Sequence, residues 1–307
     1  MSKVKFVVDF VSEYLQTMEN SFLKTFSSGG VLSNEIASYV LISKGKRLRP
    51  VLVFLFGMFG EVSKEHYLLA EAVELVHNAT LIHDDIVDDA DIRHSKPSVH
   101  FVWGYKNAVL AGDFLLAHAL ERLQQIKNPC ILHIFVNSLQ EICKGEMDEF
   151  SSEKTTIDSY LKRIYRKTAL LFAISSKCSL ILNNKPENIV NAGFQYGKNL
   201  GMAFQIIDDM LPYLSNSLNK SLEVDFLNKI DTLPIILAKE EGLSVFESVS
   251  FEEQKKIIKD FNILDKCMDF ALEYTNNAKE NLKIFEDIPS KEALISLLDG
   301  VLDTEGL

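Results

Sequence analysis

The chain has 307 residues and 47% hydrophobic content, enough to bury a large core in one domain or two. Its net charge of −11 and pI near 5.2 argue against nucleic-acid binding and against a general electrostatic grip on an anionic membrane. The four cysteines lack C-x-x-C spacing, which argues against zinc knuckles and disulfides and favours a cytoplasmic protein. Asp9 interrupts the first apolar run and no long apolar run follows, so we expect neither a secretion signal nor a membrane-spanning helix.

Apolar residues recur at three- and four-residue spacing through most of the chain, for example over residues 157–171 and 194–211. This period is typical of helices that bury one face. Glycine and proline are few, and no Asn-Gly or Asp-Gly pair separates two alternating segments, so no sheet is predicted. We therefore predict one all-helical domain over residues 1–307.

The first informative segment is a basic run, residues 43–50, which ends in Pro50, a residue suited to the first turn of a helix. Gly45 permits close backbone approach, and the apolar residues 51–56 that follow place the run beside the core. We interpret the run as a phosphate-binding site, with an ordinary solvated basic segment as the alternative.

An aspartate-rich segment lies near the end of the next predicted helix, with aspartates at positions 84, 85, 88, 89 and 91. Asp84 and Asp88 continue a stripe that is small or apolar at Val76 and Thr80. On an exposed helix such like charges cost only about 0.2–0.5 kcal/mol per pair, whereas burial without a cation would cost several kcal/mol per ion. The segment is therefore either a solvated acidic face or a Mg²⁺ site.

A second acidic pair, Asp208-Asp209, is predicted to end the helix over residues 194–211, with Asp208 on its inward stripe. Two such helix ends facing each other would form a multi-metal cleft of the kind that clamps a diphosphate. Whether they face each other depends on the tertiary structure.

Taken together and in order, the motifs of this chain resemble those of the trans-isoprenyl diphosphate synthases, or polyprenyl synthetases, over about residues 35–300. No single motif would suffice, but six in the same order are highly specific. The matching pieces are Gly45-Lys-Arg-Leu-Arg-Pro50, Asp84-Asp85-Ile-Val-Asp88, Gly112-Asp-Phe-Leu-Leu116, Lys167-Thr168, Phe204-Gln205-Ile-Ile-Asp208-Asp209 and Thr232-Leu-Pro234.

The resemblance implies an isoprenoid synthase fold, a single large helical bundle around a central active-site cavity, usually in a homodimer. It implies a prenyltransferase that extends an allylic diphosphate with isopentenyl diphosphate by Mg²⁺-dependent ionisation, condensation and elimination. It also leaves room for a peripheral membrane contact during product release.

The resemblance further implies roles for individual residues. Two to three Mg²⁺ ions would be bound by Asp84, Asp85, Asp88, Asp208 and Asp209. The substrate-binding residues would be Lys46, Arg49 and His77 for isopentenyl diphosphate, together with Arg93, His94, Lys167, Lys220 and Lys229. The catalytic residues would be Asp84, Asp208, Lys167, Thr168 and Gln205, the last two near the developing charge.

Two segments depart from the pattern of the family. Members usually carry Arg-Arg-Gly where this chain has Arg93-His94-Ser95, so we expect weaker or pH-dependent isopentenyl diphosphate binding at His94. In the second motif Asp208-Asp209 is followed by Pro212 in place of a third aspartate, and the loop to Lys220 looks shortened. Because the main carboxylates are retained, we expect activity to be retained.

The length of the product is also suggested by the resemblance. In this family, bulky aromatic residues shortly before the first aspartate close the product tunnel, whereas this chain has Val76, Ala79 and Thr80 there. These small side chains predict a long-chain product, beyond twenty carbons.

Three alternatives remain beside this interpretation. The first is a non-catalytic or regulatory subunit of a heteromeric prenyl diphosphate synthase, against which the retained aspartates and lysine argue. The second is a terpene cyclase on the same fold, in which Lys46 and Arg49 would have no role. The third is a helical bundle that binds calcium or iron, but no Glu-x-x-His pair or calcium-loop pattern supports it.

Overall fold

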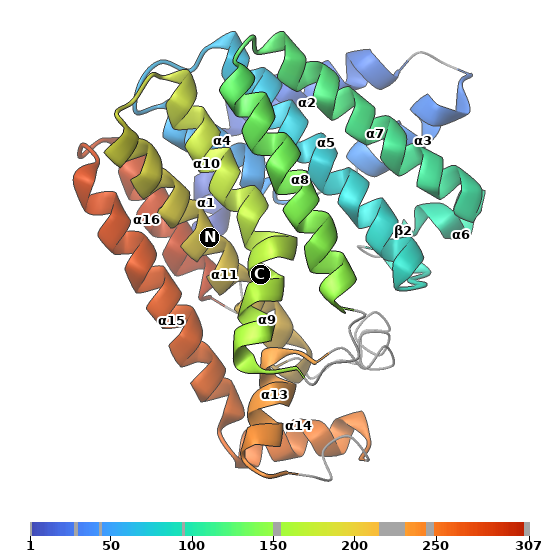
Figure 1. Cartoon of the computed structure of the whole chain (residues 1–307), viewed down its shortest axis with the longest axis vertical. Coiled ribbons are helices and arrows are strands. Elements are labelled where there is room, and N and C mark those ends of the chain that lie inside the picture. The colour runs from blue at the N-terminus through green and yellow to red at the C-terminus, as the bar shows by residue number, and fades with distance from the viewer. Residues whose placement is uncertain are drawn as a thin grey trace.

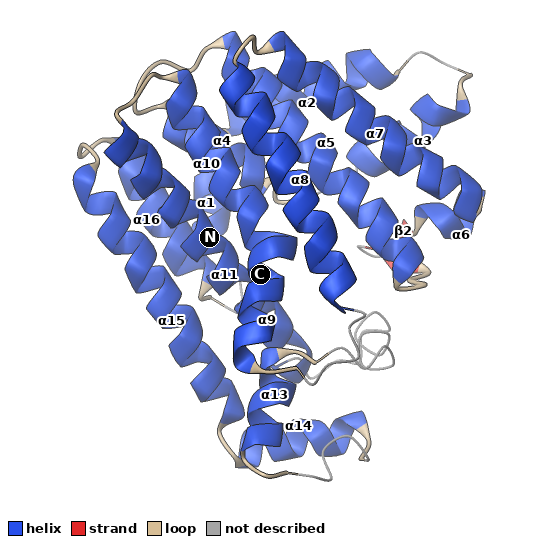
Figure 2. Cartoon of the chain, viewed as in Figure 1, coloured by secondary structure: helices blue, strands red, loops and turns tan. Residues whose placement is uncertain are grey.

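The computed structural model describes residues 2–27, 30–42, 45–93, 96–149, 155–214, 231–243 and 249–303. These residues are almost entirely helical (Figures 1 and 2). The strands among them are β1 (Ile92–Arg93) and β2 (Lys96–Pro97), an antiparallel pair with Ile92 opposite Pro97. The predicted all-α fold is confirmed.

The helices follow one another in order along the chain. The first half contains α1 (Lys3–Phe10), α2 (Ser12–Phe26), α3 (Leu32–Leu41), α4 (Leu48–Gly57), α5 (Lys64–Val87), α6 (Val99–Trp103), α7 (Tyr105–Gln125) and α8 (Pro129–Glu149). The second half contains α9 (Ile157–Ile164), the π-helix η1 (Tyr165–Ala169), α10 (Leu170–Leu182), α11 (Glu187–Leu214), α13 (Leu233–Glu240), α14 (Phe251–Asp260), α15 (Ile263–Asn281), the 3₁₀ turn η3 (Leu282–Ile284) and α16 (Pro289–Val301).

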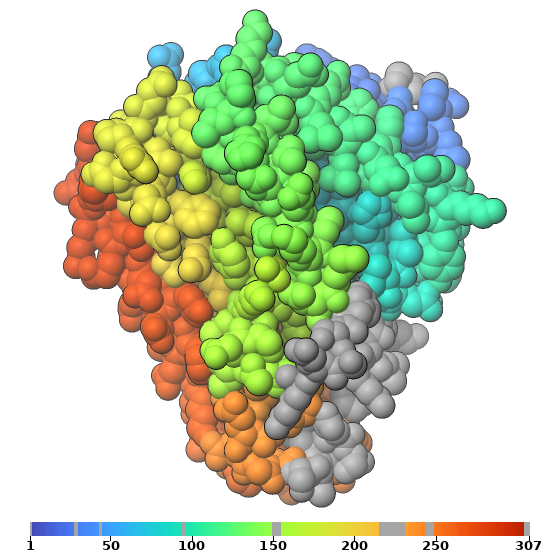
Figure 3. Space-filling view, in the orientation of Figure 1, coloured from blue at the N-terminus to red at the C-terminus, as the bar shows by residue number. Residues whose placement is uncertain are grey.

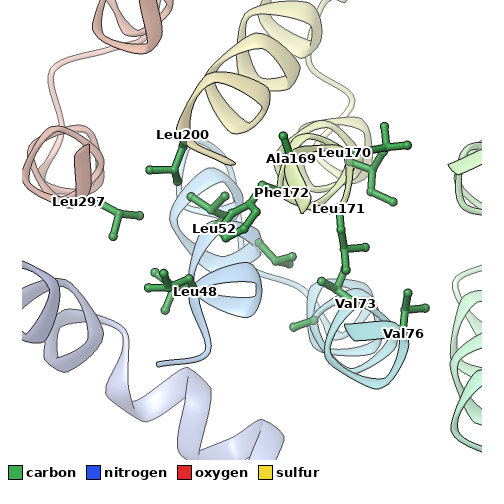
Figure 4. Packing of buried hydrophobic residues seen from close by; sticks show 14 of the residues in the cluster. Leu48, Leu52, Val73, Val76, Ala169, Leu170, Leu171, Phe172, Leu200 and Leu297 are labelled. Atoms are coloured by element: carbon green, nitrogen blue, oxygen red, sulfur yellow. The ribbon is translucent and has the colours of Figure 1, made fainter. Parts of the chain in front are cut away.

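The centre of the molecule is formed by α4, which is buried at every position except Arg49. A helix that is apolar all round needs neighbours on all sides. Helices α5, α10 and α16 pack against it, and side chains of α7 and α8 cover the middle of the face seen in Figure 3. Figure 4 shows Leu52 of α4 between these neighbours, with Val73 on one side and Leu297 on the other. Within the described ranges, no helix has the length and apolar composition needed to cross a bilayer.

Two glycines set the distance between α10 and α11. A Cβ at Gly197 would lie 2.5 Å from the carbonyl oxygen of Phe172, and a Cβ at Gly201 would lie 2.5 Å from the Cα of Ala169. Real Cβ atoms do not approach backbone so closely, so both positions require glycine. This close packing brings the C-terminal half of α11 against η1.

The π-helix η1 interrupts the helix predicted over residues 157–171. The predicted helical spacing is present, but one turn is wider than an α-helical turn and contains Lys167 and Thr168. Single π-turns of this kind are frequent at functional sites because they redirect side chains without ending the helix.

The prediction that Asp208-Asp209 ends its helix is wrong, because α11 continues to Leu214 with Pro212 inside it. Proline has no N–H to donate, so the carbonyl four residues earlier, that of Asp208, loses its helical partner. A proline can therefore occupy a helix interior near its end, where fewer bonds are lost.

Candidate active site

The first acidic cluster occupies the last turn of α5. This helix starts at a capping box formed by Ser63 and His66 and ends at Val87, with Asp88 as its C-cap. Asp84 and Asp88 are half-buried one turn apart, as the spacing of four predicts. Asp85 is buried and accepts two bonds at Oδ1, from Nε of Arg93 at 2.7 Å and from Nη2 of Arg93 at 2.6 Å.

Arg93 interacts with the whole of this cluster. Burial alone would lower the pKa of its guanidinium, but the carboxylates of Asp85, Asp84 and Asp88 outweigh burial and raise that pKa. The guanidinium is therefore held in its charged form by three aspartates. A site that stabilises one cation in this way is also suited to a second, harder cation.

The second acidic pair is linked to the first through Arg93. Desolvation raises the pKa of Asp208, while the charges of Arg93 and Lys46 and a hydrogen bond from Gln205 pull it down. Arg93 is thus close enough to act on both Asp208 and the aspartates of α5. The charges on α5 and α11 belong to one electrostatic site, as expected if the two segments line a common cleft.

Asp209 has a different environment from Asp208. Its Oδ2 accepts a hydrogen bond from the hydroxyl of Tyr160 at 2.7 Å, and its Oδ1 accepts one from the amide of Gln205 at 2.9 Å. Burial raises the pKa of Asp209 to about 7, although both hydrogen bonds lower it. Sequence analysis paired Asp209 with Asp208 as a metal ligand, but its carboxylate is engaged within the protein.

Lys167 and Thr168 are both turned toward partners from other helices. Nζ of Lys167 lies 2.7 Å from Oε2 of Glu146 on α8, and the hydroxyl of Thr168 donates to Oε1 of Gln205 at 2.7 Å. A Cβ at Gly145 would lie 2.7 Å from the Cβ of Arg166, so this glycine allows α8 to approach η1. Glu146 was not predicted from the sequence, because its role depends on this contact between α8 and η1.

The basic run divides into residues with different surroundings. Lys46 is exposed at the surface, but partial desolvation by neighbouring atoms lowers the pKa of its ammonium, and the charge of Asp208 opposes that shift. Arg47 is buried in a left-handed conformation (φ 51°) and pairs with Glu74 and with the carbonyl of Leu41. Interpretation of the whole run as a phosphate site is wrong for Arg47, whose side chain ties α4 to α5.

Arg49 is placed between α4 and α10. Its guanidinium carbon lies 4.4 Å from the ring centroid of Phe172, and burial lowers its pKa to about 10 although Glu74 opposes the shift. Its Nε is buried without a hydrogen-bond partner among the described residues. A desolvated cation with an unused donor is a strong anion-binding group.

A pocket connects the basic run with the first acidic cluster. Half-buried His77 contributes to its wall from α5, and the adjacent, buried Asn78 also lines it. Other residues that line it are Gly45, Arg47, Glu74, Asp85, Arg93 and Pro97. The pocket is therefore bordered by two of the residues predicted to bind substrate, His77 and Arg93.

Three predicted substrate-binding residues, His94, Lys220 and Lys229, lie outside the described residues. The predicted chain-length residues are all described. Val76 and Ala79 are buried in α5, while Thr80 is half-buried and its hydroxyl donates to the carbonyl oxygen of His77 at 2.8 Å. This bond removes the polarity of Thr80 from the surface of α5.

The carboxylates of the site fit a metal ion that takes only some of its ligands from the protein. Within the described part of the chain, no three His, Cys, Asp or Glu side chains lie together in a group that could hold an ion. Mg²⁺ takes one or two carboxylates and completes its shell with water and phosphate oxygens. Asp84, Asp88 and Asp208 offer carboxylates of this kind, and lysine and arginine side chains surround them for an anion.

Comparisons with known proteins agree with this site. The chain is 32% identical over 94% of its length to a decaprenyl-diphosphate synthase of Dictyostelium discoideum, of which it covers 69%. It is 35% identical over 77% of its length to heptaprenyl diphosphate synthase component 2 of Bacillus subtilis, of which it covers 70%. A polyprenyl synthase of Caulobacter crescentus, solved with calcium and isoprenyl diphosphate, superposes with a TM-score of 0.91 at 29% identity and 98% coverage of both chains.

The family assignment follows from these findings. Residues 31–263, which include both acidic segments and the basic residues around them, match the family described as polyprenyl synthetase. The chain therefore belongs to the polyprenyl synthetase family and is an all-helical prenyltransferase.

Proposed function

We propose that this chain is a Mg²⁺-dependent trans-polyprenyl diphosphate synthase that extends an allylic diphosphate with isopentenyl diphosphate. The observation that carries the proposal is the position of Arg93, whose charge acts on the aspartates of α5 and on Asp208 of α11. Cations held between two carboxylate groups are what a departing diphosphate requires. The family of the chain supports the same chemistry.

Asp84, Asp88 and Asp208 would hold Mg²⁺, which supplies Lewis-acid neutralisation of the diphosphate oxygens when bound. Arg93 and Lys167 would donate to the same diphosphate. Lys167 is 2.7 Å from Glu146, so its ammonium is held near the cleft before substrate arrives. A group that is already in place loses little entropy on binding.

Lys46, Arg49 and His77 would bind isopentenyl diphosphate. The ring of Phe172 fixes the plane of the Arg49 guanidinium, and burial strengthens its field. His77 lies in the wall of the adjacent pocket. The second substrate would then lie near Thr168 and Gln205, whose polar side chains would stabilise the developing allylic cation.

The product would be a long-chain polyprenyl diphosphate. Val76 and Ala79 are small and lie about one to two turns before Asp84 on α5, where the proposed product tunnel would run. The similar proteins from Dictyostelium and Bacillus are named as decaprenyl and heptaprenyl synthases. Their names support a long product for this chain.

We also propose a homodimer that works in the cytoplasm, with α6 and α7 at the interface. Exposed apolar side chains gather on these helices, including Phe101 at 61% exposure and Leu110 at 64%. Tyr105 and Val109 lie one turn apart on α7 and extend the same apolar surface. A second copy would remove this surface from water.

The alternative is a regulatory subunit that needs a second chain, and the Bacillus relative is named as one component of its enzyme. Retention of Asp84, Asp88, Lys167 and Asp208 disfavours this alternative. Purified protein should therefore form polyprenyl diphosphates alone.

The test is chromatography of products formed from Mg²⁺, radiolabelled isopentenyl diphosphate and geranyl, farnesyl or geranylgeranyl diphosphate. Asp84→Ala and Asp208→Ala should abolish turnover with unchanged circular dichroism, because they remove ligands rather than core atoms. Asp269→Ala on α15, an exposed aspartate, is the control. Product formed at wild-type rates by the first two variants would refute the proposed function.

A further inference from the structure

Four side chains form a hydrogen-bonded chain behind the second acidic pair. The hydroxyl of Tyr160 donates to Oδ2 of Asp209 at 2.7 Å, and the amide of Gln205 donates to Oδ1 at 2.9 Å. The hydroxyl of Thr168 then donates to Oε1 of Gln205 at 2.7 Å. These hydrogen bonds join the continuous segment formed by α9 and η1 to α11, which is distant from it in the sequence.

Tyr160, at one end of this series of hydrogen bonds, is held in place by its surroundings. The ring of Tyr160 is fully buried, and burial next to Asp209 raises the pKa of its hydroxyl well above the ordinary value, so it stays a donor. The helix that carries Tyr160 starts at a capping box formed by Thr156 and Ser159. If Asp209 turned away toward a ligand, the buried hydroxyl would lose its partner at a cost of about 1–3 kcal/mol.

The same hydrogen bonds also fix the orientation of the Gln205 side-chain amide. Its nitrogen faces Asp209 and also donates to Asp208, while its oxygen faces the hydroxyl of Thr168. Turning the amide over would place its oxygen against the carboxylate oxygen of Asp209, so the hydrogen bond to Asp209 would be replaced by a repulsive contact. Only one orientation is therefore compatible with these neighbours.

Neighbouring residues on a helix point about 100° apart, so Asp208 and Asp209 cannot share one direction. The charges of Arg93 and Lys46 act on Asp208, whereas the two carboxylate oxygens of Asp209 accept hydrogen bonds from Tyr160 and Gln205. We infer that Asp209 and Tyr160 are positioning residues for the proposed reaction: they hold the amide of Gln205 in one orientation and, through it, the hydroxyl of Thr168. This inference rests on the proposed function and gives Asp209 a structural role beside Asp208, the metal ligand of that proposal.

A first experiment measures binding without turnover, by titration calorimetry of inorganic pyrophosphate in the presence of Mg²⁺. Asp208→Asn should weaken binding at least about tenfold. Asp209→Asn should stay within about threefold of wild type, because an asparagine oxygen still accepts from Gln205 and its nitrogen can donate to the oxygen of Tyr160. Equal losses in the two variants would overturn the inference and leave the proposed function intact. Wild-type binding by both Asp84→Asn and Asp208→Asn would overturn the proposed function, and the inference with it.

A second experiment separates positioning from general stability. Tyr160→Phe removes one buried hydroxyl, and it should lower kcat about tenfold while the Mg²⁺ concentration for half-maximal rate stays unchanged. Tyr196→Phe is the matched control, because Tyr196 is equally buried and donates one 2.7 Å bond to the carbonyl of Leu294. Both variants should lose similar thermal stability, but Tyr196→Phe should keep wild-type kcat.

Two results would contradict the positioning role. A Tyr160→Phe variant with wild-type kcat would show that the anchor is not needed. Parallel losses of kcat in both tyrosine variants would show that the hydroxyls act only through stability. Asp209→Ala, which removes both acceptors, should fall further in kcat than Asp209→Asn.

Discussion

The guanidinium of Arg93 holds the buried carboxylate of Asp85, with Nη2 and Oδ1 2.6 Å apart. Arg93 is about one-third exposed and Asp85 is almost completely buried, so the pair lies at the rim of the pocket that contains His77. The same guanidinium interacts with Asp208 on the other acidic segment. This one side chain thus connects the two clusters that the reaction needs together.

Replacement of Arg93 by lysine should therefore reduce kcat/KM for the allylic substrate by about 10- to 100-fold, because an ammonium cannot reproduce the planar fork. Steady-state kinetics with a fixed primer measure the effect. Arg122→Lys is the control, since Arg122 of α7 pairs with buried Glu71 of α5 at 2.6 Å, away from the acidic segments. A similar loss of kcat/KM in both variants would indicate a general effect of weakening a buried ion pair.

Substitution of Ala79 by phenylalanine should shorten the product. Ala79 is fully buried in α5, so the ring must occupy space beside that helix, at a cost of about 1–3 kcal/mol. Reversed-phase chromatography of dephosphorylated products measures the length. Ala278→Phe on α15 tests overpacking elsewhere, since Ala278 is also fully buried. Unchanged product length in Ala79→Phe would rule out a tunnel along this part of α5.

The stability of the metal-free protein should depend on Asp209. Its pKa is raised by burial to about 7, above the value of about 3.9 expected in the unfolded chain. A raised pKa means that the folded state binds the proton more tightly, so the stabilisation is present below pH 4 and is lost as pH rises through 7. Thermal unfolding is measured in EDTA at pH 5 and pH 8. The melting temperature should fall less between these two pH values for Asp209→Asn than for wild type. Equal decreases would contradict the assigned burial of this carboxyl.

A charge placed on the apolar surface of α7 should disrupt the proposed dimer. Leu110→Glu should shift the protein to a monomer, measured by light scattering during size-exclusion chromatography, because a carboxylate would be desolvated at the interface. Leu272→Glu on α15 is the control, since Leu272 is also exposed. A dimer that persists in Leu110→Glu would place the interface on another face.

The sequence alone determined the helical class, the family resemblance and most of the candidate residues. Apolar spacing is a local property of each helix, so it predicts α5 and α11 without knowledge of their neighbours. The cluster of Asp84, Asp85 and Asp88 stands out because burial of these carboxylates without a cation would be costly.

Only the tertiary structure decided what each charged group does. Arg47 and Arg49 look alike in the sequence, but one pairs with Glu74 and the other stacks on Phe172. Asp208 and Asp209 are adjacent, yet a rotation of about 100° per residue sends them to different neighbours. Tyr160 and Glu146 had no motif of their own, because their roles depend on contacts between helices that are distant in the sequence, and no local pattern records such contacts.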